Sequence, residues 1–258
     1  MNKLIFLDID GTLLRDNGTF NDKIKKVIEK HHQKNNKIIL TSARPRNKVI
    51  DICNQLNLNT YFISSNGAEI YDYDKCKKIY TQGISKSSIL YIYNLALKYN
   101  IQLILAINNK EYTVNADKYD NRPKATEIIL RKYKVKQCMI ISGKLSVLKR
   151  FIKKLDVLDD ISFTLNIETL ENDKYWYSVV NRDVSKGNAC VILSNLIKIN
   201  LKNTIGIGND YNDISMFKLL GKSVAVENAT DSIKTMVDTI IDSNNNDGVY
   251  KYLKKILK

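Results

Sequence analysis

The sequence predicts an α/β protein in which an α+β domain is inserted into a parallel-sheet core domain. Two observations support this prediction. Near both ends of the chain, short apolar runs alternate with helix-periodic segments, as in strands joined by crossover helices. Between these ends, helices and strands follow one another in a different order. We therefore expect a core domain of residues 1–82 and 183–258 and an inserted domain of residues 83–182.

The composition fits a soluble globular protein. The 258 residues are 44% hydrophobic and 26% charged. No stretch approaches the ~20 apolar residues of a membrane span, and no signal peptide is visible. We therefore expect a cytoplasmic protein with no membrane partner. For its assembly we expect a monomer or weak homo-oligomer, with no sequence feature that decides between them. The net charge of +14 comes from lysine spread through the chain without a nucleic-acid-binding module, so we expect no nucleic acid partner.

The cysteines and histidines form no metal-binding or redox pattern. The four cysteines lie far apart, and we expect them to be buried free thiols. His31 and His32 are adjacent in a lysine-rich segment, where we expect a solvated helix end.

The first expected strand, Lys3–Leu7, is followed by two carboxylates. Asp8 and Asp10 are two residues apart, so they share one face of an extended chain. Two carboxylates this close repel each other unless a cation lies beside them. The pattern predicts a hard divalent metal ion, most simply Mg²⁺, and a nearby lysine. Gly11 would then let the backbone turn closely around a ligand.

The next two expected strands also end in polar residues. A helix capped by Asn21 leads to the strand Lys37–Leu40, and a helix beginning at Pro45 leads to the strand Tyr61–Ser64. The side chains after the first of these strands could bind a phosphate group or simply cap the next helix. Ligands of parallel sheets bind beyond the carboxyl ends of the strands, so these residues can meet at one site. They are Thr41, Ser42 and Arg44 after one strand, and Ser65, Asn66 and Gly67 after the other.

A hairpin of residues 69–73 and 77–81 precedes the inserted domain. Aromatic residues at 175–177 are expected to belong to the core of that domain more often than to a substrate surface. The expected helices are 85–99, 124–133 and 145–155, and the expected strands are 102–107, 111–116, 137–142, 161–167 and 174–181.

The chain then returns to the core domain with a helix that Ser185 would cap. Lys186 lies at the start of this helix, where the dipole favours anions, so it either serves a bound anion or is an ordinary surface lysine. The oxygen-bearing side chains of Asn209–Asp213, which follow the strand Thr204–Gly208, could hold a hard cation or cap a helix. We expect the last core strand at Ser223–Val226, then helices at 231–239 and 247–257.

Four stretches, taken in order, resemble the signature motifs of the haloacid dehalogenase-like superfamily, and within it the Cof-type phosphatases. The resemblance covers nearly the whole chain. It implies a Rossmann-like core domain, an α+β cap domain at residues 83–182, and hydrolysis of phosphate esters with Mg²⁺ as the cofactor. The four stretches are Asp8–Leu14, Ser42–Pro45, Ser185–Gly187 and Gly208–Asp213, with supporting matches at Ser65–Ala68 and Ala225–Ala229.

The resemblance also implies roles for the matched residues. Asp8 is the expected nucleophile, which forms an aspartyl-phosphate, and Asp10 is the expected general acid and base. Lys186 is expected to neutralise charge on the nucleophile and the phosphoryl group. Asn209 stands where many relatives carry a metal-ligating aspartate. The expected phosphate- and substrate-binding residues are Thr41, Ser42, Arg44, Gly11, Asn66, Gly67 and Asn212, and the expected metal ligands are Asp8, Asp10, Asn209, Asp210 and Asp213.

The predicted function is hydrolysis of small phosphorylated metabolites, either sugar phosphates or phosphorylated cofactors. Two alternatives remain: a phosphosugar mutase or other phosphotransferase of related fold, and a non-catalytic regulatory protein that binds phosphate. The presence of Asp8, Asp10 and Lys186 argues against an inactive site. Substrate specificity is expected to come from the cap domain, with Tyr112, Asn115, Lys174 and Trp176 as candidates.

Overall fold

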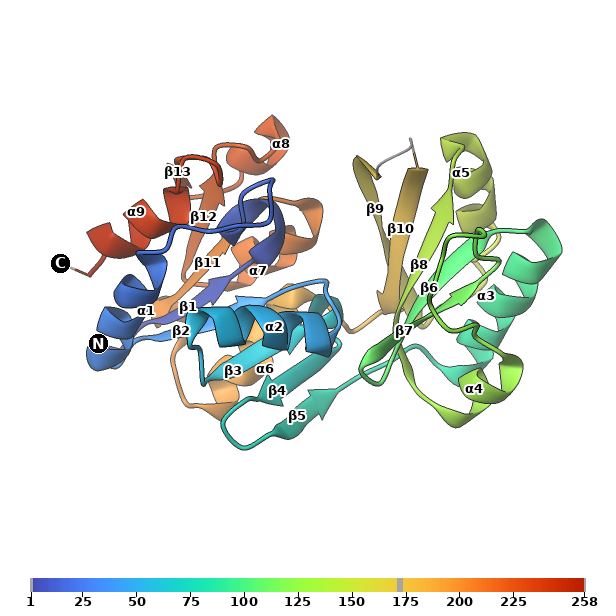
Figure 1. Ribbon diagram of the computed structural model, residues 1–258, viewed down its shortest axis with the longest axis horizontal. Helices are drawn as coiled ribbons and strands as arrows, with labels where there is room; N and C mark the ends of the chain where they lie inside the picture. The colour runs from blue at the N-terminus through green and yellow to red at the C-terminus, as the bar shows by residue number, and fades with distance from the viewer. Residues whose placement is uncertain (1, 171–173, 258) are drawn as a thin grey trace. The chain divides into compact units, whose positions relative to one another are not determined.

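The computed structural model describes residues 2–170 and 174–257, and the chain divides into two compact units (Figure 1). The first unit comprises Met1–Tyr80 and Ser185–Lys258, and the second comprises Thr81–Val184. Each boundary lies two residues from the position expected from the sequence.

The first unit is built on an eight-stranded sheet of the described residues, in the order β13-β12-β11-β1-β2-β3-β4-β5. The six strands from β13 to β3 are parallel to their neighbours, whereas β4 is antiparallel to β3. The predicted parallel-sheet α/β fold is confirmed. The strands are β1 (Leu4–Leu7), β2 (Lys37–Thr41), β3 (Tyr61–Ser64), β4 (Glu69–Asp72), β5 (Lys77–Thr81), β11 (Thr204–Gly208), β12 (Lys222–Val226) and β13 (Thr239–Ile241).

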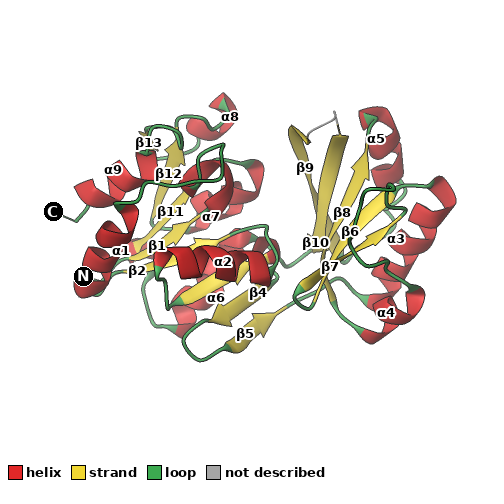
Figure 2. Ribbon diagram, viewed as in Figure 1, coloured by secondary structure: helices red, strands yellow, loops and turns green. Residues whose placement is uncertain are grey.

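Helices cover both faces of this sheet, because successive side chains of a strand point to opposite faces (Figure 2). Ile5 and Leu7 of β1 pack in one core with α1, α2 and α9, and Leu4 and Phe6 pack in the other with α6, α7 and α8. All four side chains are fully buried. The helices are α1 (Ile24–Gln33), α2 (Arg46–Leu56), α6 (Lys186–Leu196), α7 (Ile214–Leu219), α8 (Asp231–Lys234) and α9 (Gly248–Lys255).

Two expectations for the end of the chain are wrong. The segment Ser223–Val226 does not form the last strand, because β13 follows it, and the helix expected at 231–239 ends at Lys234. The Asp238 carboxylate accepts hydrogen bonds from the backbone N–H and the hydroxyl of Ser223, and Asp238 N–H donates to that hydroxyl. These bonds turn the chain out of the helix and align β13 beside β12.

Cys53, Cys138 and Cys190 are buried free thiols, as expected. Cys76 is exposed between β4 and β5, contrary to that expectation, because the hairpin turn has no core to enter.

His31 in α1 is also fully buried, so the solvated helix end expected there is wrong. Its Nε2 atom lies 2.9 Å from the carbonyl oxygen of Leu253 in α9, and the Nδ2 atom of Asn36 lies 3.1 Å from its Nδ1 atom. These partners fit a neutral imidazole that donates from Nε2 and accepts at Nδ1. Burial lowers the pKa of His31, chiefly by removing water from the charged form.

We predict that His31 makes the first unit sensitive to acid. Because its pKa in the folded protein lies below the value of about 6.5 in the unfolded chain, the unfolded chain takes up the proton first. The stability that neutral His31 contributes is complete above about pH 6.5. It is therefore lost as the pH falls from that value through the lower pKa of the folded protein. We expect the melting temperature, measured by calorimetry between about pH 7 and pH 5, to fall less steeply with decreasing pH in His31→Gln than in the wild type. His32, whose pKa burial also lowers, stays in both proteins, and an unchanged slope would contradict the prediction.

The second unit is an antiparallel sheet with helices on one face. Its described strands run in the order β7-β6-β8-β10-β9, and α3, α4 and α5 cover the face that carries Leu103, Leu105 and Ile140. The elements are α3 (Lys86–Tyr99), β6 (Gln102–Ile107), β7 (Lys110–Val114), α4 (Glu127–Lys132), β8 (Val135–Ser142), α5 (Leu145–Lys153), β9 (Ile161–Leu170) and β10 (Lys174–Asn181).

The four specificity candidates differ in their positions within this unit. Tyr112 packs against the helix-covered core, and the Asn115 side-chain amide donates to the carbonyls of Ala96 and Ile101. Both residues therefore help to hold the unit together. Trp176 pairs with Ile141 of β8 on the opposite face of the sheet, and the side chain of Lys174 lies outside the described part of the chain. Within residues 2–170 and 174–257, no helix has the length and apolar character needed to cross a membrane.

Candidate active site

The candidate site lies at the carboxyl ends of the parallel strands in the first unit. Asp8 directly follows β1, and its N–H donates to the carbonyl of Ile207 (2.9 Å), which extends the ladder with β11 by one residue. Lys186 opens α6, and Asp213 precedes α7. Segments that are far apart in the sequence therefore meet at one edge of the sheet.

Three buried charges form the centre of this site. The Lys186 ammonium donates to Oδ1 of Asp8 (2.6 Å) and to Oδ1 of Asp213 (2.7 Å). The relative exposures of these residues are 1% for Lys186, 4% for Asp8 and 0% for Asp213. Ions this deeply buried are stable only when they are paired and hydrogen-bonded, so both carboxylates depend on Lys186, their shared partner.

The cluster has an excess of negative charge, which perturbs its members. Burial, together with the Asp213 carboxylate, raises the pKa of Asp8 to about 7, although Lys186 opposes the rise. Burial alone would lower the pKa of Lys186, but Asp213 and Asp8 outweigh it and raise that pKa above its usual value. Any further positive charge at the site would therefore lower the pKa of Asp8 and favour its ionised form at neutral pH.

Asp213 and Asp210 already have partners within the protein. The Oδ2 atom of Asp213 accepts hydrogen bonds from the N–H groups of Asn209 (2.9 Å) and Asp210 (3.1 Å), while its Oδ1 accepts from Lys186. The Asp210 carboxylate accepts a hydrogen bond from Tyr211 N–H (2.7 Å) as the cap of a short 3₁₀ turn. Asp213 therefore positions Lys186 and holds the start of the loop, and Asp210 caps the turn that follows.

Asn209 faces the remaining oxygens of the site. One atom of its side-chain amide lies 3.0 Å from the carbonyl oxygen of Asp10, 3.2 Å from Oδ2 of Asp8 and 2.9 Å from the Thr12 hydroxyl. If that atom is nitrogen, it donates to these acceptors. If it is oxygen, it accepts a hydrogen bond from the Thr12 hydroxyl, and it forms with the Asp10 carbonyl oxygen and Oδ2 of Asp8 a group of three acceptor oxygens that a hard cation would stabilise.

These oxygens fit Mg²⁺. The described residues contain no group of three His, Cys, Asp or Glu side chains that could hold a metal ion. A ligand set at this place would therefore combine the Asp8 carboxylate, the Asp10 carbonyl and the Asn209 amide. Gly11 makes room for it, because its φ is +67° and a Cβ atom there would lie 2.4 Å from Nδ2 of Asn209.

Asp10 is held by an arginine. The Arg44 guanidinium donates from Nε to Oδ2 of Asp10 (2.9 Å) and from Nη2 to Oδ1 (2.5 Å). The Asp10 side chain is 55% exposed, so it faces solvent while Asp8 is enclosed. This bidentate geometry fixes the orientation of the Asp10 carboxylate.

The other predicted phosphate-binding residues border the same edge. Ser42 and Thr41 are buried, and the Ser42 hydroxyl accepts a hydrogen bond from Arg44 N–H. The N–H of Asn66 donates to the Ser42 carbonyl, and the Asn212 amide donates to Oδ1 of Asn66 (3.0 Å). Gly67 has a φ of +98°, and a Cβ there would lie 2.2 Å from the Ser185 carbonyl oxygen, so only glycine lets this loop approach the start of α6.

Two groups of supporting residues at the site were not predicted from the sequence. The side-chain amide of Asn228 donates to the Gly11 carbonyl (2.8 Å), and its oxygen accepts from Asn244 N–H. Arg46, the first residue of α2, forms a buried bidentate ion pair with Glu69 of β4. A helix-start arginine and a strand glutamate give no signal of pairing in the sequence. Asn228, by contrast, lies in a stretch that already matched the family.

The parallel sheet and the buried lysine–carboxylate cluster together define a class of protein: α/β enzymes with an acidic, lysine-neutralised site at the edge of the sheet. The chain belongs to the haloacid dehalogenase-like hydrolase family, whose model matches residues 5–253. The predicted family is therefore confirmed.

Three similar proteins illustrate the family. A protein of Buchnera aphidicola subsp. Schizaphis graminum named "Putative phosphatase" is 31% identical over 267 residues, covering 99% of this chain and 96% of the relative. The 5-amino-6-(5-phospho-D-ribitylamino)uracil phosphatase YcsE of Bacillus subtilis is 24% identical over 252 residues, covering 98% and 94%. The solved structure of the subclass IIB sugar phosphatase BT4131 matches the fold with a TM-score of 0.83 at 18% identity, covering 99% of both chains.

Proposed function

We propose that this protein is a Mg²⁺-dependent phosphatase of small phosphorylated metabolites, with Asp8 as the nucleophile and Asp10 as the general acid and base. The observation that carries the proposal is the enclosed Asp8 carboxylate, bonded to Lys186 at 2.6 Å, with the exposed Asp10 two residues further along the chain. One carboxylate is thus buried beside positive charge, while the other is open to solvent and to a leaving group.

In the first step, an oxygen of Asp8 attacks the phosphorus atom, and the bond between phosphorus and the leaving oxygen breaks. Asp10 gives its proton to that oxygen, so the leaving group departs as an alcohol. The Asp8 acyl-phosphate then carries the phosphoryl group. Lys186 offsets charge on Asp8 and on the phosphoryl oxygens as the two anions approach.

In the second step, the Asp10 carboxylate takes a proton from a water molecule whose oxygen attacks the same phosphorus atom. The bond between phosphorus and Asp8 breaks, which releases phosphate and restores both aspartates. Arg44 holds Asp10 by two hydrogen bonds, and we assign it the role of positioning this carboxylate for both proton transfers.

The metal would be held by the Asp8 carboxylate, the Asp10 carbonyl and the Asn209 side-chain oxygen. When bound, Mg²⁺ supplies positive charge that draws a phosphate dianion toward an anionic nucleophile. Because residue 209 is an asparagine and not an aspartate, this set of metal ligands contains one carboxylate instead of two.

We predict that Asn209→Asp strengthens Mg²⁺ binding by about tenfold, because a carboxylate attracts a divalent cation more strongly than an amide does. Isothermal titration calorimetry would measure this change without any turnover. Asn209→Ala should lose most of the affinity. The matched control is Asn212→Asp, which adds the same charge in the same loop at a side chain bonded to Asn66. Equal gains for the two aspartate variants would contradict ligation by residue 209.

The substrate class rests on the family and its named members. The Bacillus subtilis relative is named as a phosphatase of a phosphoribitylamino-uracil, and BT4131 is described as a sugar phosphatase. We propose substrates of this kind, either sugar phosphates or phosphorylated cofactors, for a cytoplasmic enzyme whose second unit selects the leaving group.

A panel of phosphorylated sugars and cofactors, with a generic aryl phosphate, would test the proposal through phosphate release. We expect release that requires Mg²⁺ and is abolished by chelator, with a clear ranking among the compounds. Interconversion of sugar phosphate isomers without net phosphate release would instead favour a mutase. Binding of phosphate compounds without any turnover would favour a regulatory protein.

A further inference from the structure

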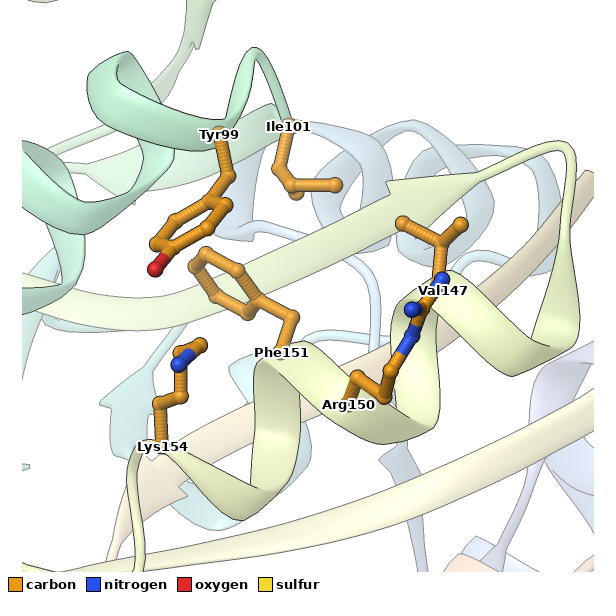
Figure 3. Close-up of a pocket in the computed structure, with 6 residues that line it drawn as sticks. All are labelled: Tyr99, Ile101, Val147, Arg150, Phe151 and Lys154. Atoms are coloured by element: carbon orange, nitrogen blue, oxygen red, sulfur yellow. The ribbon is translucent and has the colours of Figure 1, made fainter.

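The second unit contains a pocket of about 350 Å³ in its helix layer (Figure 3). It opens between the end of α3 and the outer side of α5. Its lining belongs entirely to residues 81–184, whereas Asp8, Lys186 and Asp213 belong to the first unit. The lining residues are Tyr99, Ile101, Val147, Arg150, Phe151 and Lys154.

The local backbone explains why this space is open. Asn100 adopts a left-handed conformation with a φ of +49°, which ends α3 and turns the chain into β6. Tyr99 is therefore left at the helix end with 44% of its surface exposed. On the facing side, Val147 and Phe151 are four residues apart and fall on one stripe of α5, and Lys154 directly follows the end of that helix.

The pocket combines an apolar floor with a cationic rim. Ile101 and Phe151 are almost fully buried, at 4% and 3% exposure, and form the floor. The Lys154 ammonium lies 5.2 Å from the centre of the Tyr99 ring, and Figure 3 shows the Tyr99 and Phe151 rings on the same side of the pocket as Lys154. Arg150 stands beside Val147 at the other side.

The positive charge of the rim is not balanced by neighbouring acids. Within the part of the chain that the structure describes, neither Arg150 nor Lys154 forms an ion pair with a carboxylate. Lys98 adds a further cation, 5.8 Å from the centre of the Tyr99 ring. Cations placed beside the exposed ring of Tyr99 attract a ligand that is itself both aromatic and anionic.

We propose that this pocket binds a small planar aromatic anion. Its ring would lie against the exposed ring of Tyr99, above the floor of Phe151 and Ile101, and its anionic group would lie between Arg150 and Lys154. The volume suits a ligand of one or two rings, at the small end of the range for ligand pockets. The proposal does not depend on the phosphatase assignment, because no residue of the candidate active site takes part.

Binding of 2-naphthoate, which carries no phosphate to be released, would test the proposal by calorimetry of the full chain in the presence of chelator. We expect saturable binding of one molecule per chain. The neutral analogue 2-naphthalenemethanol should bind at least about tenfold more weakly, because it keeps the ring but loses the charge. Inorganic sulfate, which lacks the ring, should not compete.

Two matched double variants locate the site. Arg150→Gln with Lys154→Gln should weaken naphthoate binding at least about tenfold. Lys149→Gln with Lys153→Gln removes the same charge from exposed positions of α5 outside the pocket lining and should leave binding unchanged. Val147→Phe, which fills the pocket without changing charge, should also abolish binding. Equal weakening by both double variants, equal binding of the neutral analogue, or no saturable binding would each overturn the proposal.

Discussion

Replacing Asp8 by asparagine is expected to abolish phosphate release, with kcat lowered by at least about 10³-fold. The amide has nearly the shape of the carboxylate but cannot attack phosphorus to form an acyl-phosphate. Since this substitution also removes one of two buried negative charges around Lys186, the variant is expected to fold and to be at least as stable as the wild type. Phosphate release at saturating substrate, together with a melting curve, would measure both effects.

The matched control for this variant is Asp51→Asn. Asp51 lies exposed on α2, so the same chemical change there should leave kcat within about twofold. Phosphate release by Asp8→Asn at a rate close to that of the wild type would exclude Asp8 as the nucleophile. A stable phosphorylated form of the wild type, absent from the variant, would instead indicate a phosphotransferase or a phosphate-responsive regulator.

Replacing Lys186 by methionine is expected to destabilise the first unit by about 3–5 kcal/mol, because it leaves Asp8 and Asp213 buried without their counter-charge. Activity should also be lost, since nothing would then offset charge on the nucleophile. Urea unfolding in the presence of chelator would measure the loss of stability without a contribution from bound metal.

Two further variants distinguish buried charge from simple loss of packing. Lys218→Met, at an exposed position of α7, removes the same charge and should change stability by less than about 0.5 kcal/mol. Adding Asp8→Asn to Lys186→Met removes one stranded carboxylate and should recover part of the lost stability. If the double variant is no more stable than Lys186→Met alone, the cost does not arise from unpaired charge.

The sequence predicts the fold well where strands are short apolar runs that end in polar residues. Tyr61–Ser64 and Thr204–Gly208 form strands with the expected bounds, because burial on both faces demands continuous apolar residues. The edge strand β13 escaped prediction because it is only three residues long, and its Ile240 is half exposed, so it lacks the buried apolar run that marks the central strands. Its alignment depends on hydrogen bonds between Asp238 and Ser223, which no local pattern reveals.

The site is less predictable than the fold, because a loop rich in oxygen ligands serves several purposes equally well. Asp210 and Asp213 have the chemistry of metal ligands, and in the structure Asp210 also caps a turn and Asp213 also bonds to Lys186. The pairing of Asp10 with Arg44 and the burial of His31 both depend on tertiary contacts. Residue type and spacing predict which side chains gather at the site, but not which of them bond to one another.

Along the sequence, the second unit separates Asp8 from its partner Lys186. The ribosome therefore makes the whole second unit between these two residues. Asp8 and the central strand β1 emerge first, but Lys186 and the neighbouring strand β11 follow only after residues 81–184. While the chain is being made, β1 therefore lacks one of its two flanking strands, and Asp8 lacks its counter-ion. Translation has to pass residue 208 before β1 can gain its second flanking strand. Until then one edge of an apolar strand is unpaired in the nascent chain, a condition that favours aggregation.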